Sequence, residues 1–214
     1  MPRKIKVNKK QVLKQPDEFI SFGSKVFQFL KTYQKQFLII LPIIAILIIS
    51  ISLFNYYTKH NDELAFSMLT KTLETEKDIN KKKAALINIK NKKFTDASKY
   101  ASFYLAQIYY SQNDKTGAKK ELENAMSIKN DYYKSSAINL YADILVSENK
   151  LNEAISIIDK NSVFSSPFKE ELLFKKAQIL EQLNKKDEAV KIYEQINKDY
   201  PDFYLIKLVQ AKLK

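Results

Sequence analysis

Few side chains in this sequence could perform covalent chemistry. The chain of 214 residues contains no cysteine, a single histidine, His60, and two glycines, Gly23 and Gly117. Without cysteine there are no thiol nucleophiles, disulfides or thiolate metal ligands, and two glycines cannot build a glycine-rich phosphate loop. His60 has no second histidine to share a metal ion with, so we interpret it as a residue at a membrane interface. The sequence therefore predicts that the protein is not an enzyme and has no catalytic, cofactor or metal site.

Small residues recur at a fixed spacing in the second half of the chain. In three segments an alanine is followed by an asparagine seven residues later and by another alanine five residues after that. The three sets are Ala106, Asn113 and Ala118; Ala142, Asn149 and Ala154; and Ala177, Asn184 and Ala189. Alanine lets two helices approach closely, and asparagine tolerates the left-handed conformation that often ends a helix. Each segment is therefore predicted to be a helix–turn–helix unit that packs on its neighbours, because one unit alone cannot bury its apolar face.

These segments resemble the tetratricopeptide repeat, which has small residues at repeat positions 8 and 20, large residues at 4, 11 and 24, and proline at 32. The last segment matches through Leu173, Ala177, Leu180, Ala189, Tyr193 and Pro201. The middle one matches through Ile138, Ala142, Leu145, Ala154 and Ile158, with Pro167 one place late, and the first through Ala106, Tyr109, Ala118 and Leu122. Ser102 and Asn130 depart from the pattern at positions 4 and 32. The resemblance covers about half of the chain and implies an all-α fold of stacked helices.

In that family a groove that binds other proteins is lined by positions 2, 5, 9 and 12 of each first helix. Here these positions hold Tyr100, Phe103, Gln107 and Tyr110; Ser136, Asn139, Asp143 and Val146; and Glu171, Phe174, Gln178 and Glu181. The first row is aromatic and the others are mostly polar, a mixture that suits an extended or partly unfolded polypeptide. The alternative is that Phe103 and Tyr110 belong to the core of a short array.

Residues 37–54, with the sequence FLIILPIIAILIISISLF, carry no charge and no amide side chain. A helix of this length spans roughly 27 Å, close to the bilayer core of about 30 Å, and tyrosines flank it on both sides. We therefore expect a transmembrane helix over residues 37–57 that contacts lipid. A cleaved signal peptide is the rival interpretation, but its apolar region is usually about 7–15 residues long and a leader of 36 residues is too long for it.

The distribution of charge predicts the orientation. Residues 1–36 carry nine basic and two acidic side chains, a net charge of +7, and short basic flanks stay on the cytoplasmic side. The N-terminus is therefore expected in the cytoplasm and the C-terminal domain outside, which in a bacterium means the inner membrane and the periplasm. Residues 55–214 carry 27 basic and 22 acidic side chains, and their interspersed pattern favours a solvated surface over a nucleic-acid site.

We expect four parts along the chain. Residues 1–36 form the basic tail, where apolar residues from Phe19 to Phe37 indicate either an amphipathic helix on the inner leaflet or the start of the membrane helix. Residues 37–57 cross the membrane. Residues 58–97 form a helical adaptor or a degenerate fourth pair, with a helix from Leu64 to Thr75 capped by 61–63 and another from Asp78 to Asn91. Residues 98–214 form three repeats and a capping helix, with Phe203, Leu205, Ile206, Leu208 and Val209 facing inward.

The whole plan resembles the bacterial family of ancillary Sec-translocon subunits, which combine one span with a periplasmic tetratricopeptide-like domain. The resemblance rests on this architecture and on the repeats YLAQIYYSQNDKTGAKKEL and KKAQILEQLNKKDEAVKIYEQI. It implies partners among the Sec channel, a periplasmic chaperone or foldase, and unfolded polypeptides. One alternative is a repeat scaffold that coordinates envelope assembly or cell division, although no lipid-anchor cysteine or trimerising coiled coil is visible. Another is a sensor or secretion-apparatus anchor, in which the tail makes the contact.

Overall fold

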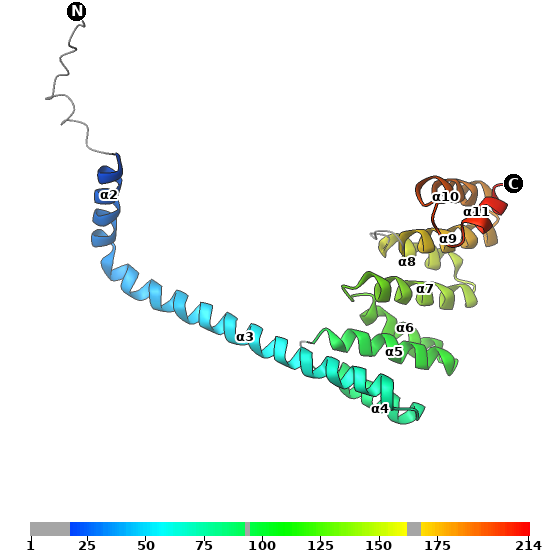
Figure 1. The fold of residues 1–214 in the computed structure, drawn as a ribbon, viewed down its shortest axis with the longest axis horizontal. Coiled ribbons are helices and arrows are strands. Elements are labelled where there is room, and N and C mark those ends of the chain that lie inside the picture. Colours follow the sequence, from blue (N-terminus) through cyan, green and yellow to red (C-terminus); the bar gives the residue numbers. More distant parts are fainter. Residues whose placement is uncertain (1–17, 93–94, 162–167) are drawn as a thin grey trace, which may run out of the picture. The chain divides into compact units, whose positions relative to one another are not determined.

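The computed structural model describes residues 18–92, 95–161 and 168–214, and it confirms the predicted all-α class (Figure 1). The described helices are α2 (Glu18–Thr32), α3 (Gln34–Thr75), α4 (Ile79–Lys90), α5 (Ala97–Ser111), α6 (Lys115–Ala125), α7 (Asp131–Ser147), α8 (Leu151–Asn161), α9 (Phe168–Gln182), α10 (Lys186–Asp199) and α11 (Ile206–Lys212). The chain divides into two compact units, Met1–Tyr57 and Thr58–Lys214.

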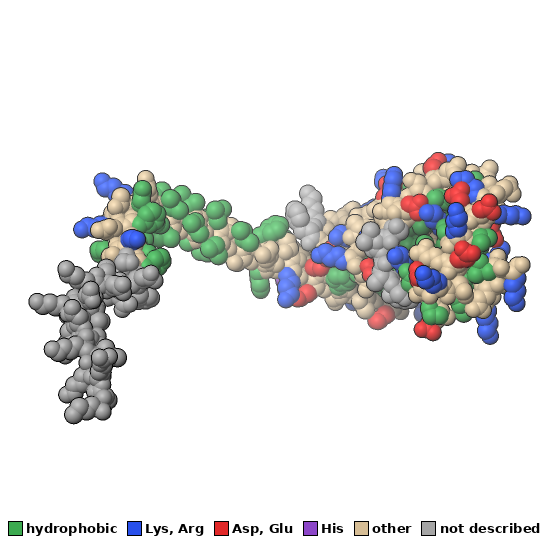
Figure 2. Space-filling view, turned by 90° about the horizontal axis from the view of Figure 1, so that it is seen from above, with side chains coloured by type: hydrophobic (Ala, Val, Ile, Leu, Met, Phe, Trp, Pro, Cys, Tyr) green, Lys and Arg blue, Asp and Glu red, His purple; other side chains and the backbone are tan. Residues whose placement is uncertain are grey.

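The first unit contains α2 and the part of α3 up to Tyr57. The two helices are separate rather than one continuous helix. A turn at Tyr33 separates them, and the Phe29 ring lies 4.8 Å from the Tyr33 ring and 5.9 Å from the Phe37 ring across this turn. Among the residues that the structure describes, α3 is the one helix long and apolar enough to cross a membrane. Its apolar side chains between 38 and 54 are exposed and form the hydrophobic segment in Figure 2.

The expected helix cap at residues 61–63 is wrong, because α3 continues without interruption to Thr75. Asp62 instead caps a different helix: its Oδ1 atom accepts a hydrogen bond of 3.0 Å from the backbone N–H of Ala97, the first residue of α5. The cap at Asp78 is present, and its Oδ1 accepts hydrogen bonds from the backbone N–H groups of Asn80 and Lys81 at 2.8 and 3.0 Å.

The second unit is a stack of helical pairs that follows the order of the chain (Figure 1). The last part of α3 and α4 pack together on α5 through an apolar cluster: Ala65, Leu69, Leu86, Ile89, Ala97, Ala101, Leu105 and Ile108. The last part of α3 and α4 therefore lie at the start of the stack, packed against α5. The pairs α5/α6, α7/α8 and α9/α10 follow, and α11 packs on α10.

The three pairs share the same turn. Asn113, Asn149 and Asn184 have φ angles of 62°, 60° and 60°, the left-handed conformation that asparagine tolerates. In each turn the next N–H bonds to a carbonyl oxygen of the first helix; the bonds are Asp114 to Tyr109 at 2.8 Å, Lys150 to Leu145 at 2.9 Å and Lys185 to Leu180 at 2.9 Å. The predicted alanines Ala106, Ala118, Ala142, Ala154, Ala177 and Ala189 are at most 1 % exposed.

The departures from the repeat pattern have local explanations. Ser102 is fully buried, and its hydroxyl oxygen accepts a hydrogen bond of 2.9 Å from the Asn124 amide. Asn130 caps α7, because its side-chain oxygen accepts from the N–H groups of Tyr132 and Tyr133. Pro167 lies outside the described residues. Leu208 is 45 % exposed rather than inward-facing, because it borders the groove described below.

Ion pairs connect successive pairs of helices. Lys90 on α4 binds the buried Glu121 of α6 at 2.7 Å, and Lys119 on α6 binds Glu148, which caps the C-terminus of α7, also at 2.7 Å. A partly exposed pair such as Lys119–Glu148 contributes about 0–1 kcal/mol, and the cost of burying the Glu121 carboxylate offsets part of its attraction to Lys90. Basic and acidic side chains intermingle over the face of the stack that is visible in Figure 2. The main stabilisation therefore comes from apolar packing between helices.

Replacing Ala142 by arginine tests the packing at a helix crossing. The variant Ala142→Arg forces a charge into a site with no exposed area, so we expect the free energy of unfolding to fall by at least about 3 kcal/mol. Thermal melting followed by circular dichroism measures the loss. The control Ala211→Arg changes an exposed alanine of α11 and should alter stability by less than about 0.5 kcal/mol. Equal melting temperatures for the two variants would contradict the assigned crossing.

Candidate functional site

The first helices of the three pairs form one layer, because α7 contacts both α5 and α9. Residues three or four positions apart lie on the same side of a helix. Gln107 and Tyr110 therefore share a side of α5, and Ser136, Asn139 and Asp143 share a side of α7. These sides border a series of adjoining cavities, which we call the groove.

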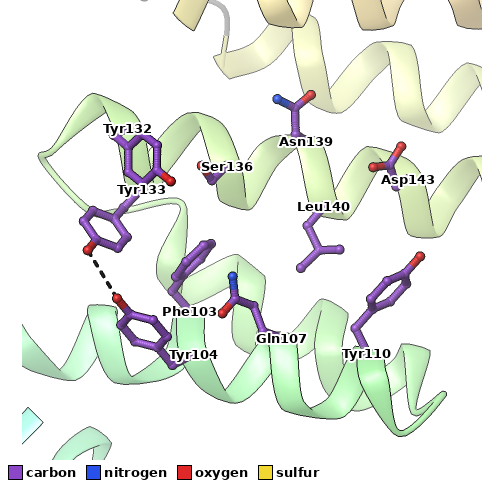
Figure 3. Close-up of a pocket in the computed structure, with 10 residues that line it drawn as sticks. All are labelled: Phe103, Tyr104, Gln107, Tyr110, Tyr132, Tyr133, Ser136, Asn139, Leu140 and Asp143. Atoms are coloured by element: carbon purple, nitrogen blue, oxygen red, sulfur yellow. Dashed lines mark hydrogen bonds between the residues drawn. The ribbon is translucent and has the colours of Figure 1, made fainter. Parts of the chain in front are cut away.

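The largest of the described cavities lies between α5 and α7 and has a volume of about 650 Å³. We call it the α5–α7 trench. Its lining residues are Phe103, Tyr104, Gln107, Tyr110, Tyr132, Tyr133, Ser136, Asn139, Leu140 and Asp143 (Figure 3). Figure 3 shows Phe103, Tyr104, Tyr132 and Tyr133 gathered at one end, whereas Tyr110 and Asp143 lie at the other. The trench therefore has an aromatic end and a polar end.

Ring contacts fix the aromatic end. The Tyr133 ring lies 5.5 Å from Phe103 and 5.2 Å from Tyr132 in edge-to-face arrangements, which are favourable for aromatic pairs. The hydroxyl groups of Tyr104 and Tyr133 share a hydrogen bond of 3.2 Å, drawn as a dashed line in Figure 3. These contacts join α5 to α7, and Tyr132 is still 58 % exposed.

Polar groups lie at the centre and the other end of the trench. The Asn139 Oδ1 atom is buried and has no hydrogen-bond partner. Asp143 accepts a hydrogen bond of 2.6 Å from Lys175 on α9 through Oδ1. Of the trench-lining residues that the structure describes, it is the charged one. An unpaired buried carbonyl oxygen costs free energy, so Asn139 gains most from a ligand that carries an N–H group.

The groove continues from α7 to the C-terminal segment. A cavity of about 440 Å³ lies between α7 and α9, and one of about 460 Å³ is lined by Asn139, Glu171 and Phe174 together with Phe203, Tyr204 and Leu208. All three cavities share Asp143. Residues 203–208, expected only to cap the core, therefore also form a wall of the groove.

The structure brings most of the sequence-predicted groove residues together. Gln107, Tyr110, Asn139, Asp143, Gln178 and Glu181 line the cavities, as do Phe103 and Phe174, which are only 4 % and 6 % exposed. Glu181 is bound to the Lys212 ammonium at 2.8 Å. Tyr100 does not line these cavities, because its ring packs between Phe66 and Tyr133 at 5.3 and 4.9 Å.

The four positions counted in each first helix missed several residues that line the cavities. These are Tyr104, Tyr132, Tyr133, Leu140, Phe203, Tyr204 and Leu208. Tyr104 and Leu140 occupy the same repeat position, four residues after Tyr100 and Ser136. Counting this fifth position in each first helix would therefore have found both. Tyr132 and Tyr133 precede the first counted position of their repeat, and no signal within the repeat pattern marks them.

Burial changes the ionisation of the tyrosines at the aromatic end. Burial, reinforced by the hydrogen bond with Tyr133, raises the pKa of Tyr104 well above its usual value. Burial and the nearby Tyr133 also raise the pKa of Tyr100. The folded state therefore favours the neutral phenols, which keep a hydroxyl group available as a donor.

His60 is exposed. Among the described residues, no group of three or more histidine and acidic side chains could hold a metal ion. The chemistry available in the groove is thus apolar contact through rings and hydrogen bonding through amides, hydroxyls and carboxylates.

Stacked helical pairs with a groove along their first helices define a helical-repeat protein of the interaction-scaffold class. A protein-family model described as a tetratricopeptide repeat-like domain matches residues 28–214, and the chain belongs to this family. No curated protein matches the chain. Domains of this kind are typically scaffolds without enzymatic activity, and they generally mediate protein–protein interaction.

The raised pKa of Tyr104 predicts a loss of stability at alkaline pH. Its folded pKa lies above its unfolded value of about 10, so its contribution is complete below that pH and falls as the pH rises toward the folded pKa. We expect Tyr104→Phe, compared with the parent, to lose less stability between neutral pH and pH about 11, measured by thermal melting. The control Tyr110→Phe removes an exposed hydroxyl from the same helix. If Tyr104→Phe loses as much stability as the parent, the Tyr104–Tyr133 pair does not govern the dependence of stability on alkaline pH.

Proposed function

We propose that this protein is a membrane-anchored scaffold that binds extended polypeptide segments in the groove. The observation that carries the proposal is the lining of the α5–α7 trench, which contains aromatic rings together with the amides of Gln107 and Asn139. Figure 3 shows Gln107 beside the Phe103 ring. Rings provide apolar contact area, and amides bond to the peptide groups of a main chain. The tetratricopeptide repeat-like family supports the same class of function.

We further propose that residues 37–57 cross a bacterial inner membrane and contact its lipids. Exposed apolar side chains such as Ile39 (65 %) and Leu53 (63 %) on α3 support this assignment, because in water they would be unfavourably solvated. The net charge of +7 on residues 1–36 favours a cytoplasmic N-terminus. Residues 58–214 then lie in the periplasm.

Within this class, the architecture favours an ancillary subunit of the Sec protein-export translocon. Such a subunit needs to hold a groove beside the exit of the channel. A basic flank, a single span and a small outer domain of repeats would do this. The proposed partners are the Sec channel, a periplasmic chaperone or foldase, and the emerging unfolded polypeptides. A scaffold for envelope assembly or cell division has the same architecture and is the competing outcome of the experiment below.

The topology has a direct test. Protease added to the outside of spheroplasts should digest residues 58–214, because the basic flank that stays inside is N-terminal. Immunoblotting with antibodies against each end follows the fragments, and the N-terminal epitope should stay protected until the membrane is permeabilised. Full protection of the C-terminal epitope in intact spheroplasts would overturn the orientation.

The partners can be identified by purification from native membranes in mild detergent, followed by mass spectrometry. We expect the Sec channel and a periplasmic foldase to co-purify with the full chain and to be absent from a shortened chain that ends at Tyr57. The shortened chain is a matched control because it keeps the tail and the membrane segment. Division or envelope-assembly proteins in place of the Sec channel would contradict the translocon proposal and leave the scaffold class intact.

A further inference from the structure

The two ends of the α5–α7 trench differ in chemistry, and this difference determines which segment fits. The aromatic end contains Tyr132, which is 58 % exposed, and its neighbour Tyr133. It offers ring faces for an apolar side chain. The opposite end contains Asp143, which is the one charged side chain among the described residues that line the trench. A ligand therefore meets apolar surface at one end and a carboxylate at the other.

The groove is acidic although the chain is basic. Beside Asp143, the two adjoining cavities contain Glu171 and Glu181 together with Lys175. Lys212 binds Glu181 at 2.8 Å, so the three acids face two lysines and keep an excess of one negative charge. The whole chain carries a net charge of +12. Lys175 bonds to Oδ1 of Asp143, and among the described residues no further hydrogen bond reaches Oδ2. Charge complementarity at this end therefore favours a lysine or arginine of the ligand.

Asn139 lies between the two ends on α7. Its Oδ1 atom is buried without a partner, so the amide has to rotate toward the trench before an N–H group of a bound segment can reach this oxygen and remove the cost. A side-chain amide can donate to and accept from one peptide group. An extended backbone, whose N–H and C=O groups are free, satisfies Asn139 in a way that a helix does not.

The length of the trench sets the spacing of the ligand. Tyr133 and Asp143 are ten residues apart on one helix, which corresponds to about 15 Å along its axis. An extended chain covers about 3.3 Å per residue. The two ends are therefore about four or five ligand residues apart.

We propose that the α5–α7 trench binds an extended polypeptide segment with an apolar residue at one end and a basic residue about four positions away. The apolar side chain contacts Tyr132 and Tyr133, the basic side chain binds Asp143, and the backbone between them bonds to Asn139. The inference rests on the proposed function, that the groove binds polypeptide, and it adds the class of segment.

The test measures peptide binding to the full chain in nanodiscs of zwitterionic lipid by fluorescence anisotropy. The probe is a labelled peptide with one leucine and one arginine about four positions apart in a glycine–serine background. One comparison peptide has glutamate in place of arginine, and another has glycine in place of leucine. Because the chain is strongly cationic, non-specific attraction would favour the glutamate peptide. We expect the opposite order, with the arginine peptide about tenfold tighter.

Single variants separate the three contacts. Asp143→Asn should reduce the preference for arginine over glutamate from about tenfold to less than about threefold, whereas Glu194→Gln, an exposed acid on α10, should keep it. Asn139→Ala should weaken the binding of the arginine and glutamate peptides about fivefold each, without changing the ratio of their affinities. The control Asn152→Ala, at an exposed position on α8, should leave both affinities unchanged. Tyr132→Ala should weaken the leucine peptide and leave the glycine peptide unchanged.

The outcomes distinguish the inference from the function on which it rests. Peptides that bind with no preference for arginine, or with a preference unaffected by Asp143→Asn, overturn the inference and leave a polypeptide-binding groove. Failure of every peptide to bind contradicts both. A self-associated parent that Tyr132→Ala dissociates in light scattering, together with no peptide binding, would mean that a second copy of the chain occupies the trench.

Discussion

The close approach of helices at six buried alanines is the contact on which the rest of the repeat unit depends. Ala106 with Ala118, Ala142 with Ala154, and Ala177 with Ala189 lie in the three apolar clusters of the stack. Larger residues such as Leu122, Ile158 and Tyr193 fill the space around them. Packed helices lie about 8–10 Å apart. The first helices α5, α7 and α9 contact one another in order and form one layer, and side chains on one side of this layer line the groove.

The asparagine turns and alanine crossings could be predicted because their rules act over short distances in the sequence. Counting from these positions also named Asn139, Asp143 and Gln178, which line the cavities of the groove. The count started too late in the middle repeat, because α7 begins at Asp131, before the first counted position at Ser136. Two tyrosines of the aromatic end, Tyr132 and Tyr133, lie in this early turn. Tyr133 is held by rings of α5, which a pattern within one repeat does not contain.

The cap at Asp62 shows why the start of the stack was harder to predict. A capping rule relates a side chain to N–H groups two or three residues ahead, and it therefore assigned Asp62 to its own helix. The chain instead uses this carboxylate on the N-terminus of α5, 35 residues further on. Contacts of this kind arise only after α3, α4 and α5 are packed together, so no local sequence pattern predicts them. The same reason applies to Tyr204, which reaches the groove from beyond the last repeat.

The ordered stacking of helical pairs has a consequence for how the protein folds. The described helices contact those next to them or next but one in the chain, so each contact closes only a short loop and costs little chain entropy. Chains rich in such short-range contacts fold fast. During synthesis each new pair meets a neighbour that has already formed, and residues 203–208 follow the three pairs in the chain. The wall that completes the groove is therefore added only after the helices that it faces.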